Sequence, residues 1–237
     1  MFRSSLRLGF LALSLGASAL AVAADPAPSK RPIAEIELGK LTDDTQRVSS
    51  PGNHLNLVWW IPPQFWAASA TQGGETDQKK IDEVAQLFGK YTIVAVVKGE
   101  MGVVTMGEFM DEDQVREIAR VVDAKGRKLE PLPAKKLEPD LVLLLGILKP
   151  ILKSMIGPAG ENMHFLAFPA KDASGAAIAD PYRDGGLVVL LGEERFTFKT
   201  PLPSLLSPMY DATSGEAFPG TFRYNPYTGS ALTPEKR

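Results

Sequence analysis

The chain of 237 residues contains no cysteine and only two histidines, His54 and His164. The absence of cysteine excludes disulfide bonds, cysteine nucleophiles and thiolate metal sites. The motifs G-x-S-x-G, H-E-x-x-H, G-x-x-x-x-G-K-[ST] and G-x-G-x-x-G are also missing. The sequence therefore lacks the common local signatures of serine hydrolases, zinc proteases and nucleotide-binding enzymes.

Neither sign of charge dominates, because 26 Lys and Arg stand against 28 Asp and Glu. Nucleic-acid-binding domains usually carry a clear basic excess, so we expect no nucleic-acid partner. The length suits one large domain or two small ones, and a core of that size needs no disulfide bonds.

The N-terminal residues have the pattern of an export signal. Arg3 and Arg7 precede an apolar run from Leu8 to Leu20, and Ala21-Val22-Ala23 has the small-x-small pattern of a cleavage site. The apolar run is shorter than the ~20 residues that a membrane span needs. We therefore expect residues 1–23 to be a cleaved signal peptide, with a retained membrane anchor as the alternative, and the protein to be periplasmic or secreted.

Residues 24–51 are rich in Pro, Ser, Lys and Asp, and we predict a flexible leader there. The alternation from Leu55 to Ile61 predicts a strand, and Pro63 suits the first turn of a following helix. The three tryptophans of the chain are Trp59, Trp60 and Trp66. They are expected either to plug one end of the core or to form an aromatic platform that binds carbohydrate or peptide.

Two further segments have helical spacing. Asp77 to Phe88 carries one apolar stripe, and Gly89 is a natural C-terminal stop. Glu138 to Ile156 has leucines at helical spacing, with Pro150 expected to kink the helix. This second helix either covers an open end of a sheet or docks on lipid or on a partner, through a face that includes Leu144 and Leu148.

Short apolar runs between Gly, Asp and Pro clusters predict the remaining strands. These runs are 91–97, 102–109, 115–122, 127–132, 163–168, 187–191 and 195–199. Gly192-Glu193 predicts a tight hairpin turn, and Asp111-Glu112-Asp113 an acidic tip without the ligand spacing of a calcium loop. We predict that residues 52–208 form a mainly β domain. Its expected form is a β-sandwich, possibly immunoglobulin-like, with two or three inserted helices, and the alternative is an α+β fold.

Two turns in residues 209–237 have the spacing of zinc-ribbon knuckles. A knuckle reads C-x-x-C-G, and Asp211–Gly215 and Asn225–Gly229 keep this spacing with Asp, Ser, Asn and Thr in the thiolate positions. The chain thus resembles exported bacterial proteins with a Cys-less, zinc-ribbon-like tail. The resemblance implies no activity and no zinc, and it implies that Asx- and ST-turn hydrogen bonds hold the knuckles. The alternative is a hairpin framed by two ordinary turns.

These observations favour a non-enzymatic exported module that binds a protein or an envelope ligand, without a cofactor. No catalytic residue and no metal ligand stands out. The candidate binding residues are Trp59, Trp60, Trp66, Leu144 and Leu148. Two alternatives stay open. One is a periplasmic hydrolase that uses carboxylates or His164, and the other is association with a membrane surface through residues 138–156.

Overall fold

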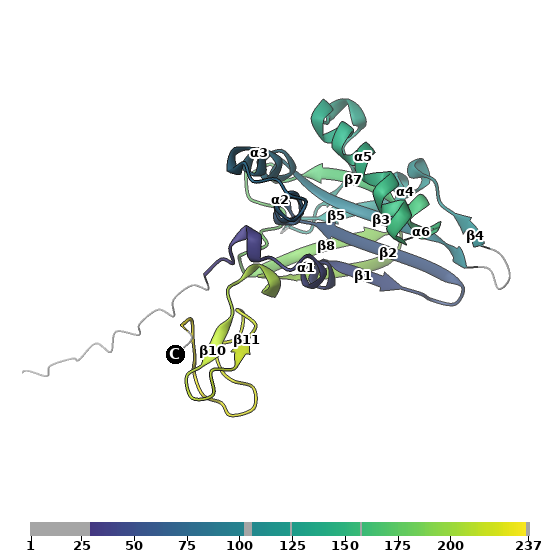
Figure 1. Cartoon of the computed structure of the whole chain (residues 1–237). Coiled ribbons are helices and arrows are strands. Elements are labelled where there is room, and N and C mark those ends of the chain that lie inside the picture. Colours follow the sequence, from purple (N-terminus) through teal and green to yellow (C-terminus); the bar gives the residue numbers. More distant parts are fainter. Residues whose placement is uncertain (1–28, 102–105, 124, 157, 236–237) are drawn as a thin grey trace, which may run out of the picture.

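The computed structural model describes residues 29–101, 106–123, 125–156 and 158–235. Within these residues the chain is a mixed α+β protein built on antiparallel sheets (Figure 1). The α+β alternative therefore fits, and helices contribute more to the fold than a mainly β reading of the sequence expects.

The first sheet, sheet 1, is organised around its longest strand. Its members are β1 (Gln46–Ser49), β2 (His54–Ile61), β3 (Tyr91–Met101), β4 (Met106–Phe109) and β7 (His164–Pro169). The order is β1-β2-β3, and β7 and β4 both pair with β3, each at a different part of the strand. All these pairs are antiparallel.

The second sheet, sheet 2, has the order β6-β5-β8-β9. Its strands are β5 (Ala119–Val122), β6 (Lys128–Leu129), β8 (Gly185–Leu191) and β9 (Glu194–Thr200). The turn between β8 and β9 consists of Gly192 and Glu193, as predicted, and Gly192 has a φ of 67°. Such a positive φ suits glycine, which explains the residue at the tightest point of the hairpin.

Helices connect and cover these sheets. Helix α3 and helix α5 confirm the two predicted helical segments, and α2 begins at Pro63 as expected. The helices are η1 (Ile33–Glu35), α1 (Leu38–Thr45), α2 (Pro63–Gln72), α3 (Gln78–Gly89), α4 (Glu112–Ile118), η2 (Ala134–Lys136), α5 (Pro139–Ile156), α6 (Pro158–Glu161) and η3 (Pro203–Leu205).

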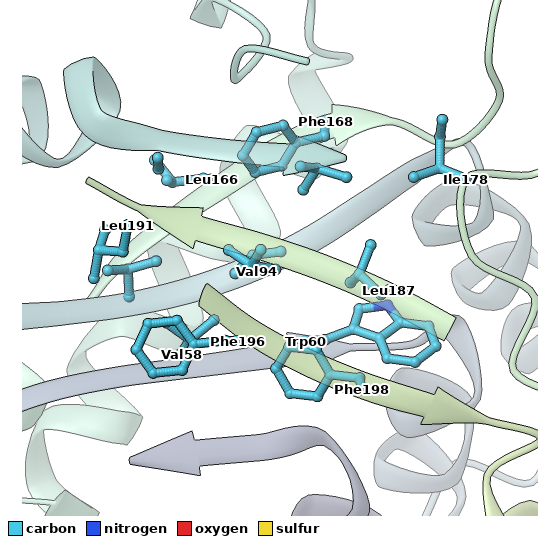
Figure 2. Close-up of a cluster of buried hydrophobic side chains, with 14 of the residues drawn as sticks. Val58, Trp60, Val94, Leu166, Phe168, Ile178, Leu187, Leu191, Phe196 and Phe198 are labelled. Carbon is cyan, nitrogen blue, oxygen red and sulfur yellow. The ribbon is translucent and has the colours of Figure 1, made fainter. Parts of the chain in front are cut away.

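One hydrophobic cluster joins the two sheets, and we call it the inter-sheet cluster (Figure 2). Sheet 1 contributes every second residue of its strands, and sheet 2 does the same from the opposite side. Sheet 1 contributes Val58, Trp60, Val94, Val96, Leu166 and Phe168, and sheet 2 contributes Val121, Leu187, Val189, Leu191, Phe196 and Phe198.

A second cluster, the helix-facing cluster, lies on the other face of sheet 1. Residues such as Leu57 and Ile93 from the strands meet Phe88 of α3 and Leu141 of α5 there. Because β3 is buried on both faces, its sequence from Ile93 to Val97 is continuously apolar rather than alternating. The order of layers is therefore sheet 2, sheet 1 and then helices.

The three tryptophans lie inside these clusters. Trp60 belongs to the inter-sheet cluster, whereas Trp59 and Trp66 belong to the helix-facing cluster. The Trp66 ring stacks on Phe88 with ring centroids 4.1 Å apart. All three side chains are buried. They fill the core, so the idea of an exposed aromatic platform is wrong.

The segment predicted as a flexible leader is folded from Ser29 onward. It forms η1, α1 and β1, and β1 pairs with β2. Ile36 and Leu41 are buried in the inter-sheet cluster, which anchors this segment to the core. The expectation failed because the segment is mostly polar, whereas its few apolar residues are enough to anchor it to the core. Residues 24–28 of that prediction lie outside the described part.

The predicted strand from 115 to 122 is half helix. Asp111 accepts a hydrogen bond from the Gln114 backbone N–H, and the Gln114 side chain accepts one from the Asp111 N–H, both at 2.9 Å. This capping box starts α4, so the acidic tip is the beginning of a helix. Strand β5 covers only the end of the prediction, and β6 is shorter than expected. Residues 102–105 of the strand predicted before α4 lie outside the described residues.

The C-terminal tail forms a small sheet of its own. Its strands are β10 (Met209–Asp211), β11 (Ala217–Phe218) and β12 (Leu232–Thr233), with β10 in the middle. These strands lie apart from the two larger sheets (Figure 1). The preceding segment, 202–208, packs onto the core through Leu202, Leu205 and Leu206.

Candidate functional site

Four polar side chains occupy core-facing positions at one end of the space between the two sheets. They are Asn56 of β2, Lys98 of β3, His164 of β7 and Glu194 of β9. Each stands two residues from an apolar member of the inter-sheet cluster on its own strand, so each shares the inward face. We call this group the polar mouth. Asn56 lies directly opposite Lys98, which places the residues at the same end.

Hydrogen bonds connect the polar mouth across the two sheets. Asn56 Nδ2 donates to Glu194 Oε1 at 2.6 Å, and Lys98 Nζ donates to Asn56 Oδ1 at 3.0 Å. Lys98 Nζ also lies 3.5 Å from Glu194 Oε1. Asn56 is fully buried, and burial of a polar group without partners is unfavourable. The network therefore satisfies the buried amide and links sheet 1 to sheet 2.

His164 is buried beside this network. Its Nε2 lies 3.0 Å from the carbonyl oxygen of Met110. A carbonyl oxygen can only accept, so Nε2 donates this hydrogen bond, and Nδ1 has no hydrogen-bond partner among the described residues. The hydrolase alternative requires either convergent acids in a cleft or His164 within hydrogen-bond reach of a serine and an acid. The observed contact is with a backbone carbonyl instead.

A cleft of about 440 Å³ adjoins the polar mouth. Three carboxylates line it, those of Glu100, Glu108 and Glu194, against the single ammonium of Lys98. His54 Nδ1 is 3.8 Å from Glu100 Oε1. The other lining residues are Gly99, Phe109, Met110 and Gln114. The cleft is therefore acidic and suits a ligand that carries positive charge or hydroxyl donors.

Two glycines shape the wall of this cleft. A Cβ atom at Gly99 would collide with the ring of Phe109, and one at Gly107 would collide with the carbonyl oxygen of Glu100. Strand β4 can therefore approach β3 closely only because both positions lack side chains.

The exposed face of α5 differs from the predicted one. Leu144 and Leu148 are half-buried and pack against the helix-facing cluster. The exposed apolar residues of the helix are instead Val142, Leu143 and Ile147. The expected contact residues are therefore wrong in register, although the helix does present an apolar face.

The two tail turns have the hydrogen bonds that the zinc-ribbon resemblance implies. Asp211 Oδ1 accepts from the N–H groups of Thr213 and Ser214, and Asn225 Oδ1 accepts from those of Tyr227 and Thr228. The glycine that ends each turn has a φ above 70°, a conformation that glycine adopts readily.

Asp211 also joins the two turns to each other. Its Oδ2 accepts from Asn225 Nδ2 at 2.8 Å and from Ser230 Oγ at 2.6 Å. These bonds, with those from Ser214 and Thr213, hold the pKa of the Asp211 carboxyl well below its usual value. In the part of the chain that the structure describes, no group of three or more His, Asp or Glu side chains is placed to hold a metal ion.

The sequence did not reveal the polar mouth as a site. Asn56, Lys98 and Glu194 are single polar residues on three strands, and only strand register brings them together. The available signal was that Asn56 and Lys98 are polar residues in the mostly apolar strands β2 and β3. No protein-family model, curated protein or solved structure matches this chain. Across the described residues, no helix is both long enough and apolar enough to cross a membrane.

Proposed function

We propose that this chain is an exported, non-enzymatic binding module whose ligand occupies the acidic cleft at the polar mouth. The observation that carries the proposal is the network of Asn56, Lys98 and Glu194 beside that cleft. Charged groups at core-facing positions are costly, and sequences usually place them there for a functional reason. The pattern of residues 1–23 supports export, and the two facing sheets support a β-sandwich arrangement.

The chemistry of the cleft selects the class of ligand. Three carboxylates face the cleft, and the one ammonium is already held by Asn56 and Glu194. A ligand with an amine or with several hydroxyl groups complements this lining. Because Lys98 is engaged in the network, its role is to orient Glu194 rather than to react.

A thermal-shift screen of the purified protein tests the proposal. The probes are polyamines, oligolysine peptides and oligosaccharides. A ligand of the cleft should raise the melting temperature of the wild type, and Glu108→Gln should weaken its affinity about fivefold to tenfold. The matched control is Glu216→Gln, which removes the same charge from an exposed position in the tail. The proposal fails if no probe binds, or if both variants bind every probe like the wild type.

The convergence of Glu100, Glu108 and Glu194 on one cleft favours a hydrolase as the second candidate. Glycosidases act through a pair of such carboxylates, one as acid and one as base or nucleophile. Turnover of chromogenic glycosides, lost in Glu100→Gln or Glu108→Gln without loss of binding, would support catalysis. Binding without turnover would support the module.

Membrane-surface association is the third candidate, and exposed Val142, Leu143 and Ile147 on α5 support it. Apolar helix faces of this kind can insert into the interface of a bilayer.

A further inference from the structure

Strand β9 leaves one edge of sheet 2 open. Among the described strands it pairs only with β8, and Leu191 and Glu194 are the closing pair of a two-residue hairpin. Hydrogen-bonded pairs alternate along an antiparallel ladder, so Arg195, Thr197 and Lys199 direct their N–H and C=O groups away from β8. Within the described part of the chain, none of these groups has a hydrogen-bond partner.

The side chains of the same three residues are exposed on the outer face of sheet 2. Neither Arg195 nor Lys199 forms an ion pair with a described residue, although acids are as frequent as bases in this chain. Half-buried Leu190 lies directly beside Arg195 on β8. In the described part of the chain, the free edge thus combines unpaired backbone groups with two positive side chains that form no ion pair.

A groove of about 540 Å³ adjoins this strand. Thr197, Lys199 and Thr200 line it from β9, Arg47 lines it from β1, and Asp43 and Asp44 line it from α1. The Thr200 hydroxyl is buried and has no hydrogen-bond partner in the described residues. The Arg47 guanidinium lies 5.1 Å from the centre of the Phe198 ring. The groove gives an added strand space beside β9.

A second copy of β9 does not suit this edge. In an antiparallel pair of β9 strands centred on Thr197, Arg195 of each copy would lie opposite Lys199 of the other, and like charges directly opposite are destabilising. A segment with acidic side chains four residues apart has the complementary charge. It also supplies the backbone groups that the edge lacks.

We propose that the free edge of β9 binds an extended acidic peptide segment of another protein by strand addition, with its acidic side chains beside Arg195 and Lys199. The site is separate from the cleft at the polar mouth, so either proposal can fail without the other.

Fluorescence anisotropy of the full chain with labelled seven-residue peptides tests this inference. One peptide alternates Val and Glu, and its partner alternates Val and Lys. The acidic peptide should bind and should weaken with added salt, and the basic one should not bind. The double variant Arg195→Glu/Lys199→Glu should lose at least tenfold in affinity. The control Lys79→Glu/Lys80→Glu on α3 makes the same charge change away from the edge and should bind normally.

A second pair of measurements isolates the backbone contribution. Thr197→Pro removes one outward N–H at a position where an edge strand tolerates proline, and it should abolish binding. Should this variant not fold, methylation of alternate peptide nitrogens makes the same test on the ligand. Binding that survives both changes overturns strand addition. So does equal binding of both peptides, or a dimer of the free chain in sedimentation that is lost in Thr197→Pro.

Discussion

Trp60 illustrates how much of the core depends on one side chain. Its ring is 2% exposed and meets the edge of Phe198 across the inter-sheet space, with centroids 6.2 Å apart (Figure 2). We expect Trp60→Ala to lower the free energy of unfolding by about 3–5 kcal/mol, because it opens a large cavity between two sheets. Urea denaturation measures this change. Tyr227→Ala, at an 82% exposed position, is the control and should stay within about 0.5 kcal/mol of the wild type.

Asp211 gives the tail a distinct acid response. Hydrogen bonds from Ser230 and Asn225 keep its pKa well below the ordinary 3.8. A carboxyl group whose pKa is lower in the folded than in the unfolded state stabilises the fold at pH values above its unfolded-state pKa. This stabilisation is lost as the pH falls through the folded-state pKa. We expect the amide resonances of Thr213 and Ser214 to stay unchanged through pH 4 and to shift only at lower pH. A midpoint near 3.8 would contradict the assigned hydrogen bonds. In Asp211→Asn the carboxylate titration should disappear.

Helix α5 has one buried and one exposed apolar side, and substitutions on the two sides should differ in their effect on stability. Leu141 is fully buried, whereas Leu143 is 64% exposed. We expect Leu141→Ala to cost about 2–5 kcal/mol of stability, and Leu143→Asp to change it by less than about 0.5 kcal/mol. Urea denaturation of both variants checks this pair. Similar losses would mean that Leu143 has a partner in solution.

Substitution on the same exposed side of α5 tests whether the protein associates with a membrane surface. Co-sedimentation with anionic vesicles should fall in Leu143→Asp and stay unchanged in Tyr227→Asp, whose position is exposed in the tail. If the wild type does not bind vesicles, or if all three proteins bind them equally, the proposal of membrane association through α5 is wrong.

The elements that the sequence predicted well are those with long, regular periods. Helix α3, helix α5 and the strands β2, β3, β8 and β9 each repeat one apolar pattern over several residues. Helices α1 and α4 were missed because each has fewer than ten residues, and polar side chains cover most of both. In α4 the deciding information was the capping box at Asp111 rather than periodicity.

The candidate site was harder to predict for a different reason. Asn56 and Glu194 are 138 residues apart in the chain and meet only because two sheets pack face to face. The leucine face of α5 was placed wrongly because several apolar positions on that helix are equivalent in sequence, and only the packing direction against sheet 1 separates them. The residue pattern within a segment predicts its helix or strand, whereas the candidate site depends on how distant helices and strands pack together.

The molecule also depends on one ion-pair cluster that connects distant loops. Arg127 Nε lies 2.7 Å from Asp123 Oδ2, and Arg127 Nη2 lies 3.2 Å from Asp172 Oδ2. The β5–β6 turn is thereby fixed to the loop between β7 and β8. Both carboxyl groups are nearly inaccessible, whereas Arg127 is half-exposed, so protonation of either acid breaks a connection between two parts of the fold.

The acid stability of the whole chain should reflect this cluster. The Ser174 hydroxyl and backbone bonds lower the pKa of Asp172 from 3.8 to about 2. Because the folded-state pKa is the lower one, the contribution of Asp172 is complete above about pH 4 and is lost as the pH falls to about 2. We expect the urea midpoint to fall steeply over this window. In Asp172→Asn the midpoint should be lower at neutral pH and the slope shallower. An unchanged slope would mean that other carboxyl groups, such as Asp211, control the acid response.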